Sequence, residues 1–233
     1  MSELQAGWML SLVLGARHAL EPDHVAAVTT LITTERGRPA ALGMWWGVGH
    51  ALALFLVATA LSLLQRQLST EWADRCELLV AAMLIVLGVR AVYLVWAAVR
   101  EGGQGRLHFH AHGDANHAHS GPVWHIHIGG LTLSQRPLLV GLVHGLAGSG
   151  ALTALVSAKM PGMWDRLACV SLFGIGSMLG MGALAGLLGW PLSRWLVARP
   201  VAGQLLTVLA GVMSIGLGVL WSVPIVDRLL VGR

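Results

Sequence analysis

Charged side chains are scarce in this sequence of 233 residues. Asp, Glu, Lys and Arg together make up 11% of the chain, whereas a soluble globular domain carries about 25%. So few charges cannot cover a surface that faces water, and the mean hydropathy of +0.70 excludes disordered and collagen-like chains as well. The composition therefore indicates a polytopic membrane protein.

Cysteine is also sparse. Cys76 and Cys169 lie far apart and form no CxxC motif, so they indicate neither a redox pair nor a thiolate zinc site. The fourteen arginines are spread along the chain instead of clustering, which argues against nucleic-acid binding. No motif indicates a bound nucleotide or another organic cofactor, so the chain by itself does not hydrolyse ATP. Histidine is the exception, with eleven residues that need an explanation.

Long apolar runs predict an all-α fold of six transmembrane helices, because a span needs about 20 mostly apolar residues. Their approximate ranges are 6–33, 39–64, 77–99, 136–158, 163–190 and 201–222. They divide the chain into a first three-helix half, a connecting loop and a second three-helix half, which cover residues 1–100, 101–135 and 136–233.

The second half repeats the first in order and at a nearly constant shift of 126 to 130 positions. The matching segments are Gly15–Leu20 with Gly141–Leu146, Trp46–Leu52 with Phe173–Leu179, and Met83–Val89 with Met213–Val219. Chance similarity between glycine-rich apolar segments would not keep this order. Three spans in each half place the two halves in the membrane in opposite senses. This is the inverted repeat typical of transporters, whose sites lie between the halves near the midplane.

Ionisable residues crowd the first predicted span, where Arg17, His18, Glu21, Asp23 and His24 fall within eight positions. A single charge at the centre of a span costs about 2.5–3.5 kcal/mol, so such a group needs partners, water or a bound ion. His18 and His24 would point about 120° apart on a regular helix and could not share an ion.

Pro22 lies between these two histidines and removes a helical hydrogen bond. We therefore predict a break at Pro22 that turns His18 and the Asp23–His24 pair toward one metal ion. Imidazole and carboxylate ligands suit nickel, cobalt or zinc. The alternative is an Arg17–Glu21 ion pair with the histidines in ordinary helix packing, and we expect that ion pair in addition to the metal site.

Two further histidines lie inside predicted spans. His50, in the segment WWGVGHAL, is a candidate for another metal ligand. His144, in GLVHGLAGSG, is as compatible with a helix–helix hydrogen bond as with a ligand.

These motifs resemble a known family. His18-x4-Asp23-His24, preceded by Arg17, resembles the signature of the nickel/cobalt transporter superfamily, and the Gly49-His50 pair resembles its second motif. The segment VHGLAGSGAL is similar to that of the short six-helix members, which are nickel permeases or membrane-type urease accessory proteins. The resemblance implies transport of divalent nickel or cobalt through His18, Asp23, His24 and His50, and a cytoplasmic loop after the first span.

Seven histidines lie in residues 107–128 of the connecting loop, namely His108, His110, His112, His117, His119, His125 and His127. The HxH spacing sets both imidazoles on one side of an extended strand, where they form weak metal chelates. The alternative is a flexible polar linker that merely tolerates histidine.

The balance of basic residues decides little about the orientation, but it agrees with the cytoplasmic loop that the resemblance implies. With the N-terminus outside, the inner loops hold seven basic residues and the outer side holds six. We therefore predict a multi-pass inner-membrane protein with both termini outside and the histidine-rich loop in the cytoplasm. A transition-metal ion and the lipid bilayer are its predicted partners, while an oligomeric state and a metallochaperone partner stay open.

The sequence thus predicts metal transport by alternating access and no enzymatic activity. The main alternative is an intramembrane zinc hydrolase that uses the same His/Asp cluster to activate water. No His-Glu-x-x-His pair is present, and an inverted repeat is typical of transporters.

Overall fold

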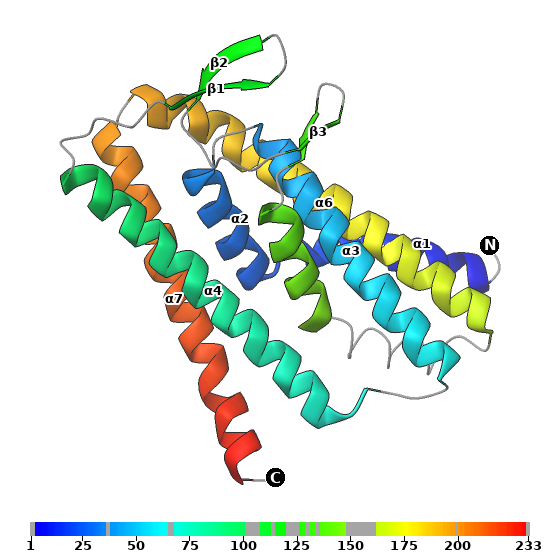
Figure 1. Cartoon of the computed structure of the whole chain (residues 1–233). Helices are drawn as coiled ribbons and strands as arrows, with labels where there is room; N and C mark the ends of the chain where they lie inside the picture. Colours follow the sequence, from blue (N-terminus) through cyan, green and yellow to red (C-terminus); the bar gives the residue numbers. More distant parts are fainter. Residues whose placement is uncertain are drawn as a thin grey trace.

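The computed structural model describes residues 3–35, 38–64, 68–100, 108–112, 115–119, 126–128, 131–133, 136–147, 162–198 and 200–231. In this part of the chain, seven helices form a bundle (Figure 1). The helices are α1 (Glu3–His18), α2 (Pro22–Thr34), α3 (Pro39–Leu63), α4 (Thr70–Arg100), an unlabelled helix (Arg136–Ala147), α6 (Met163–Ala198) and α7 (Pro200–Val231).

Among the described residues, four helices are long and apolar enough to cross a membrane: α3, α4, α6 as far as Leu192, and α7 between Val201 and Leu230. The molecule is therefore a polytopic membrane protein. Leu187, Val201 and Leu230 are among many large apolar side chains exposed on the outside of this bundle, as expected where lipid replaces water.

The first predicted span is two helices and not one, which confirms the predicted break. α1 ends at His18, a turn follows in which Glu21 N donates to His18 O over 3.1 Å, and α2 begins at Pro22. Proline favours the first turn of a helix, because its missing N–H has no partner to donate to there. Val25 N resumes the helical pattern by donating to Glu21 O.

Other helix ends differ from the predicted ones. α4 begins at Thr70, before the predicted residue 77, while α6 continues through Pro191 and α7 through Pro224. The polar residues at these ends interrupt the apolar pattern without interrupting the helix. The predicted fourth span is described only as far as Ala147, and its remaining residues, 148–158, lie outside the described part.

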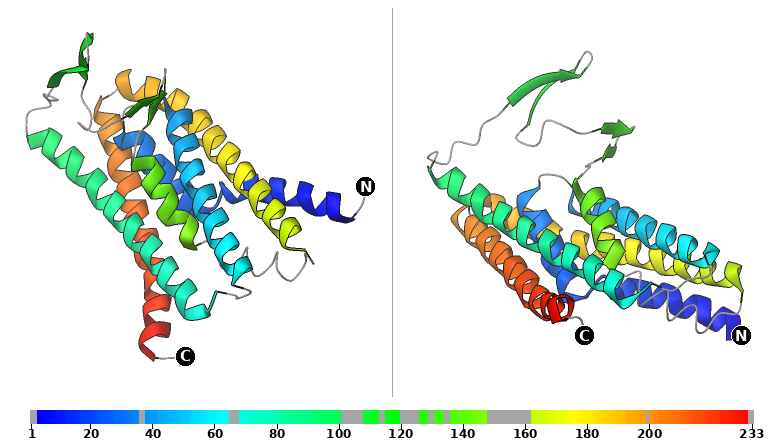
Figure 2. Two further views of the ribbon diagram at one scale, coloured as in Figure 1. Left: turned by 45° about the vertical axis from the view of Figure 1, so that its right-hand side comes forward. Right: turned by 60° about the horizontal axis from the view of Figure 1, so that its bottom comes forward.

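Two antiparallel hairpins occupy the described parts of the loop, so strands accompany the expected all-α bundle. The strands are β1 (His108–His112), β2 (Ala115–His119), β3 (Ile126–Ile128) and β4 (Leu131–Leu133). The β1–β2 register sets His108 opposite His119 and His110 opposite His117. Figure 2 shows both hairpins at one end of the bundle, away from the C-terminus.

α2 lies inside the bundle, in contact with α7, α6, α4 and α3. Its residues Val28 and Ile32 join Trp46 of α3, Leu84 of α4 and Met181 of α6 in one apolar core. α3 and α1 both pack against α6, and α4 packs against α7.

Glycine lets these helices approach at backbone distance. A Cβ on Gly141 would meet the Trp46 carbonyl and the His50 backbone nitrogen, and one on Gly15 would meet the Phe173 carbonyl. Small residues at such crossings replace the hydrophobic driving force that is missing between helices in lipid. They therefore fix how close His50 and His144 come to the broken first span.

We predict that Gly141→Ala destabilises the protein by about 1–3 kcal/mol, because the added methyl group has no space against the α3 backbone. Gly216→Ala in α7 is the matched control, since nothing lies within 4 Å of its Cβ position. Alanine there should be neutral or stabilise the helix by about 0.5–1 kcal/mol. Thermal unfolding in detergent measures both, and equal melting temperatures for the two variants would contradict the proposed packing.

Candidate metal site

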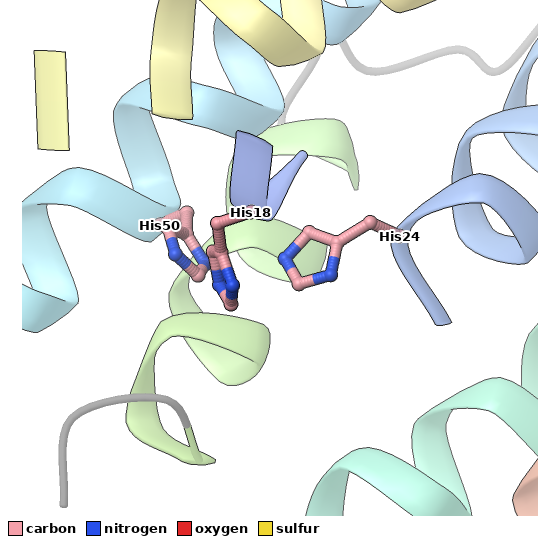
Figure 3. Close-up of side chains that lie close together, drawn as sticks. All are labelled: His18, His24 and His50. Atoms are coloured by element: carbon pink, nitrogen blue, oxygen red, sulfur yellow. The ribbon is translucent and has the colours of Figure 1, made fainter. Parts of the chain in front are cut away.

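Histidines from three helices converge where the first span breaks (Figure 3). His18 is the last residue of α1, and His24 lies in the first turn of α2. Their ring centroids are 4.4 Å apart, although a continuous helix would point them away from each other. His50, near the middle of α3, lies with its ring 5.2 Å from that of His18 and 5.4 Å from that of His24.

These three rings have free nitrogen atoms. A ring nitrogen from each of His18, His24 and His50 lies within 4.8 Å of the other two, which is close enough to hold one metal ion. Nε2 of His18, Nε2 of His24 and both ring nitrogens of His50 are buried and have no hydrogen-bond partner. His24 is 1% exposed and His50 is 0% exposed. A buried nitrogen without a partner costs about 1–3 kcal/mol, so this arrangement is not explained by stability.

In His18 and His24, the other ring nitrogen, Nδ1, contacts a carboxylate. Nδ1 of His18 lies 2.9 Å from Oε1 of Glu21, and Nδ1 of His24 lies 3.0 Å from Oδ1 of Asp23. Both His nitrogens donate, because an ionised carboxylate only accepts. Each carboxylate therefore fixes its imidazole with Nε2 available for a metal ion.

Asp23 also joins the two halves of the chain. Its Oδ2 accepts a hydrogen bond of 2.6 Å from Nε2 of His144, which belongs to the helix Arg136–Ala147. Asp23 is 4% exposed. Asp23, His24 and His144 form a second group whose ligand atoms lie within 4.8 Å of one another. The structure thus brings together all five of the intramembrane residues predicted as ligands.

The expected Arg17–Glu21 ion pair is wrong, since within residues 3–35 Glu21 pairs with His18 instead. The turn at residues 19–21 interrupts the helical face on which an i, i+4 pair depends. Both Arg17 and Glu21 instead line the cavity described below.

Two aromatic residues beside the site were not predicted from the sequence. The ring of Trp46 lies 5.3 Å from that of His24 and 5.6 Å from that of His144, and the ring of Phe173 lies 5.3 Å from that of His18. The signal was present, because Trp46 precedes His50 by one helical turn and Phe173 occupies the repeat-equivalent position. Their rings form apolar walls around the polar cluster.

A cavity of about 940 Å³ opens from the site toward one end of the bundle. His18, Asp23, His24 and His144 line its inner part, whereas Glu77 and Arg228 line the part between the start of α4 and the end of α7. In Figure 1 these helix ends lie away from the hairpins. The cavity therefore connects the site to the end of the bundle opposite the histidine-rich loop.

Six of the seven loop histidines lie in the described strands: His108, His110 and His112 in β1, His117 and His119 in β2, and His127 in β3. His125 lies outside the described residues. The strand register aligns the HxH pairs of β1 and β2, and metal binding by the loop stays a prediction.

The chain matches the family model of the high-affinity nickel-transport protein over residues 6–217. It is 33% identical over 188 residues to the urease accessory protein UreH of Bacillus sp. strain TB-90. The alignment covers 78% of this chain and 75% of that relative. No solved structure matches.

Two longer relatives match over shorter stretches. The high-affinity nickel transport protein of Cupriavidus necator is 31% identical over 111 residues, or 41% of this chain and 32% of the relative. The cobalt transport protein NhlF of Rhodococcus rhodochrous is 30% identical over 95 residues, or 40% of this chain and 27% of the relative.

We predict that His50→Leu leaves the metal-free protein as stable as the wild type or raises its stability by about 1 kcal/mol. Leucine removes two buried nitrogens that have no partner and fills a similar volume. The same variant should lose the rise in melting temperature that added Ni²⁺ gives the wild-type protein. Thermal unfolding with and without Ni²⁺ measures both effects, and a retained metal-induced rise would remove His50 from the site.

Proposed function

The chain belongs to the high-affinity nickel-transport protein family, and from this premise we propose that it carries nickel or cobalt ions across the membrane. The observation that carries the proposal is the group of buried, unpartnered imidazole nitrogens of His18, His24 and His50. Two of these residues, His18 and His24, line the cavity. Imidazole suits nickel, cobalt and zinc alike, so this donor set admits zinc as well. The alternative of an intramembrane zinc hydrolase is not supported, because the relatives are named as nickel or cobalt transport proteins or as a urease accessory protein.

In this proposal His18, His24 and His50 bind the ion, and the carboxylates orient them. Glu21 holds His18 and Asp23 holds His24, each through Nδ1, as carboxylates commonly do for metal-binding histidines. Asp23 is then an orienting residue more than a ligand, because both of its oxygens already accept hydrogen bonds. His144 secures Asp23 from the second half of the chain.

We further propose that the two halves form the inverted repeat predicted from the sequence. Close contacts between the halves support it, because they occur in pairs with the roles of the halves exchanged. Gly176 approaches Leu12 as Gly49 approaches Leu138, and the partners differ by the repeat shift of 126 or 127 positions.

A second pair of contacts agrees with this relation. Gly88 of α4 lies against Ile215 of α7, and Gly218 of α7 lies against Ile85 of α4. A two-fold axis in the membrane plane produces such exchanged pairs. Transporters built in this way bind their substrate between the halves and expose the site to each side in turn. His50, one residue from the midpoint of α3, fits a site near the membrane midplane.

The proposed orientation places both termini outside and the histidine-rich loop in the cytoplasm. The cavity beside Glu77 and Arg228 then opens to the outside. The loop would hold metal ions weakly on the inner side.

We predict that His24→Ala abolishes Ni²⁺ flux into proteoliposomes at every concentration. Asp23→Asn should raise the half-saturating Ni²⁺ concentration by about 10- to 100-fold, because it weakens the orientation of a ligand without removing one. Ser177→Ala is the matched control, since Ser177 is buried at the repeat-equivalent position of His50 and donates to the Gly15 carbonyl. Near-normal Ni²⁺ flux in His24→Ala would contradict the proposal. A metal-dependent hydrolysis of a lipid or peptide by the wild-type protein would also contradict it, if Asp23→Asn abolishes that hydrolysis.

Deleting residues 107–127 should leave flux unchanged at saturating Ni²⁺ and lower it at limiting Ni²⁺. A chain of HxH pairs raises the local ion concentration without forming the path, and its binding weakens as its histidines take up protons near pH ~6. Flux at two Ni²⁺ concentrations and two pH values measures this. Complete loss of flux in a folded deletion variant would instead make the loop part of the path.

A further inference from the structure

A buried carboxylate lies at the opposite end of α2 from the metal site. The side chain of Glu35 is 4% exposed, and its Oε1 forms ion pairs with two arginines. Nη2 of Arg90, on α4, lies 3.0 Å away, and Nη1 of Arg136, at the start of the helix Arg136–Ala147, lies 3.1 Å away. Nη1 of Arg90 also contacts Oγ1 of Thr34 at 3.4 Å. We call Glu35, Arg90 and Arg136 the arginine clasp.

Each of the three helices places the arginine clasp far from the cavity. At a rise of 1.5 Å per residue, Glu35 lies about 18 Å along α2 from Asp23, and Arg90 lies about 20 Å along α4 from Glu77. Arg136 opens a helix whose last residue, Ala147, lines the cavity. No member of the clasp lines the cavity. The clasp therefore lies at the loop-facing end, where Arg136 follows β4 by three residues.

One face of α2 connects the metal site to the clasp. His24, Val28, Leu31 and Glu35 follow one another at positions i, i+4, i+7 and i+11, which share a helix face. Val28 and Leu31 are buried apolar side chains between the two polar ends. This face thus presents an apolar layer beyond the histidines, followed by a layer of paired charges.

The net positive charge of the clasp opposes the passage of metal cations. One carboxylate and two guanidinium groups carry a net charge of +1, which repels a divalent cation that has passed the histidines. Glu35 is the buried member of the clasp, and it resists separation from the arginines because its carboxylate would then be an uncompensated charge out of water. The clasp joins α2 and α4 of the first half to the first helix of the second half.

We propose that the arginine clasp is the gate that closes the loop-facing end of the transport path while the cavity is open at the other end. Opening requires α2 to separate from Arg90 and Arg136. The same helix carries Asp23 and His24 at its other end, so a metal ion bound there can act on the gate through one rigid element. This gate rests on the proposed transport function, and its test does not depend on flux.

The experiment measures access to the face of α2. Val28→Cys is introduced as a probe into a Cys76→Ser, Cys169→Ser background, because valine and cysteine are similar in size. A membrane-impermeant thiol reagent is then applied to the full chain in vesicles from each side separately. We expect Glu35→Gln to raise the labelling rate from the loop-facing side by about 10-fold or more, because it removes the buried charge that holds two arginines.

Glu71→Gln is the matched control. It removes another Glu–Arg pair, between Glu71 and Arg75, which is exposed near the start of α4. Labelling of the probe should stay at the background rate in this variant. Arg136→Gln provides a second test of the clasp if Glu35→Gln fails to fold, since Arg136 is half exposed. The exchange Glu35→Arg with Arg136→Glu should restore protection of the probe.

Unchanged labelling in folded Glu35→Gln and Arg136→Gln variants overturns the gate, and so does faster labelling only from the cavity side. The wild-type flux assay is independent of these results. Labelling that rises as expected in a protein without Ni²⁺ flux would support the gate and reject the proposed transport function. Ni²⁺ flux with unchanged labelling would reject the gate alone.

Discussion

The break between α1 and α2 is the constraint on which the rest of the site depends. A continuous helix would point His18 and His24 in different directions and leave two polar groups in an apolar span. The turn before Pro22 removes this problem, because one helix ends at His18 and the next begins at Pro22. The rings of His18 and His24 then lie beside each other. The ends of two short helices therefore bring together two histidines that one long helix would hold apart.

The broken span needs close neighbours, and glycine supplies them. Gly141 lets the helix Arg136–Ala147 approach the α3 backbone beside His50, and Gly15 lets α1 approach α6. His144 then reaches Asp23, and Phe173 reaches His18. Much of the glycine content thus serves packing, which in turn sets the distances between ring nitrogens.

α2 carries polar groups at both ends and an apolar face between them. Its start holds Asp23 against His144, and Glu35 beyond its end lies against Arg136, so the helix Arg136–Ala147 is fastened to it at two places. The first contact adjoins the proposed metal site, and the second lies at the loop-facing end of the bundle. In the proposed transport cycle, α2 is the element through which the two ends respond to each other.

The sequence alone is enough to predict the membrane class, the break at Pro22 and the five ionisable residues that the structure brings together. These follow from local rules: apolar length, the missing N–H of proline, and the cost of charge in a span. It was wrong about the Arg17–Glu21 pair, because an i, i+4 contact requires a continuous helix. Three features are visible only in the folded chain: Asp23 bridges His24 and His144, Trp46 and Phe173 lie against the histidine rings, and Glu35 pairs with Arg90 and Arg136. These contacts join residues far apart in the chain, and their partners are set by which helix crossings the glycines permit, a property of three-dimensional packing that no local pattern encodes.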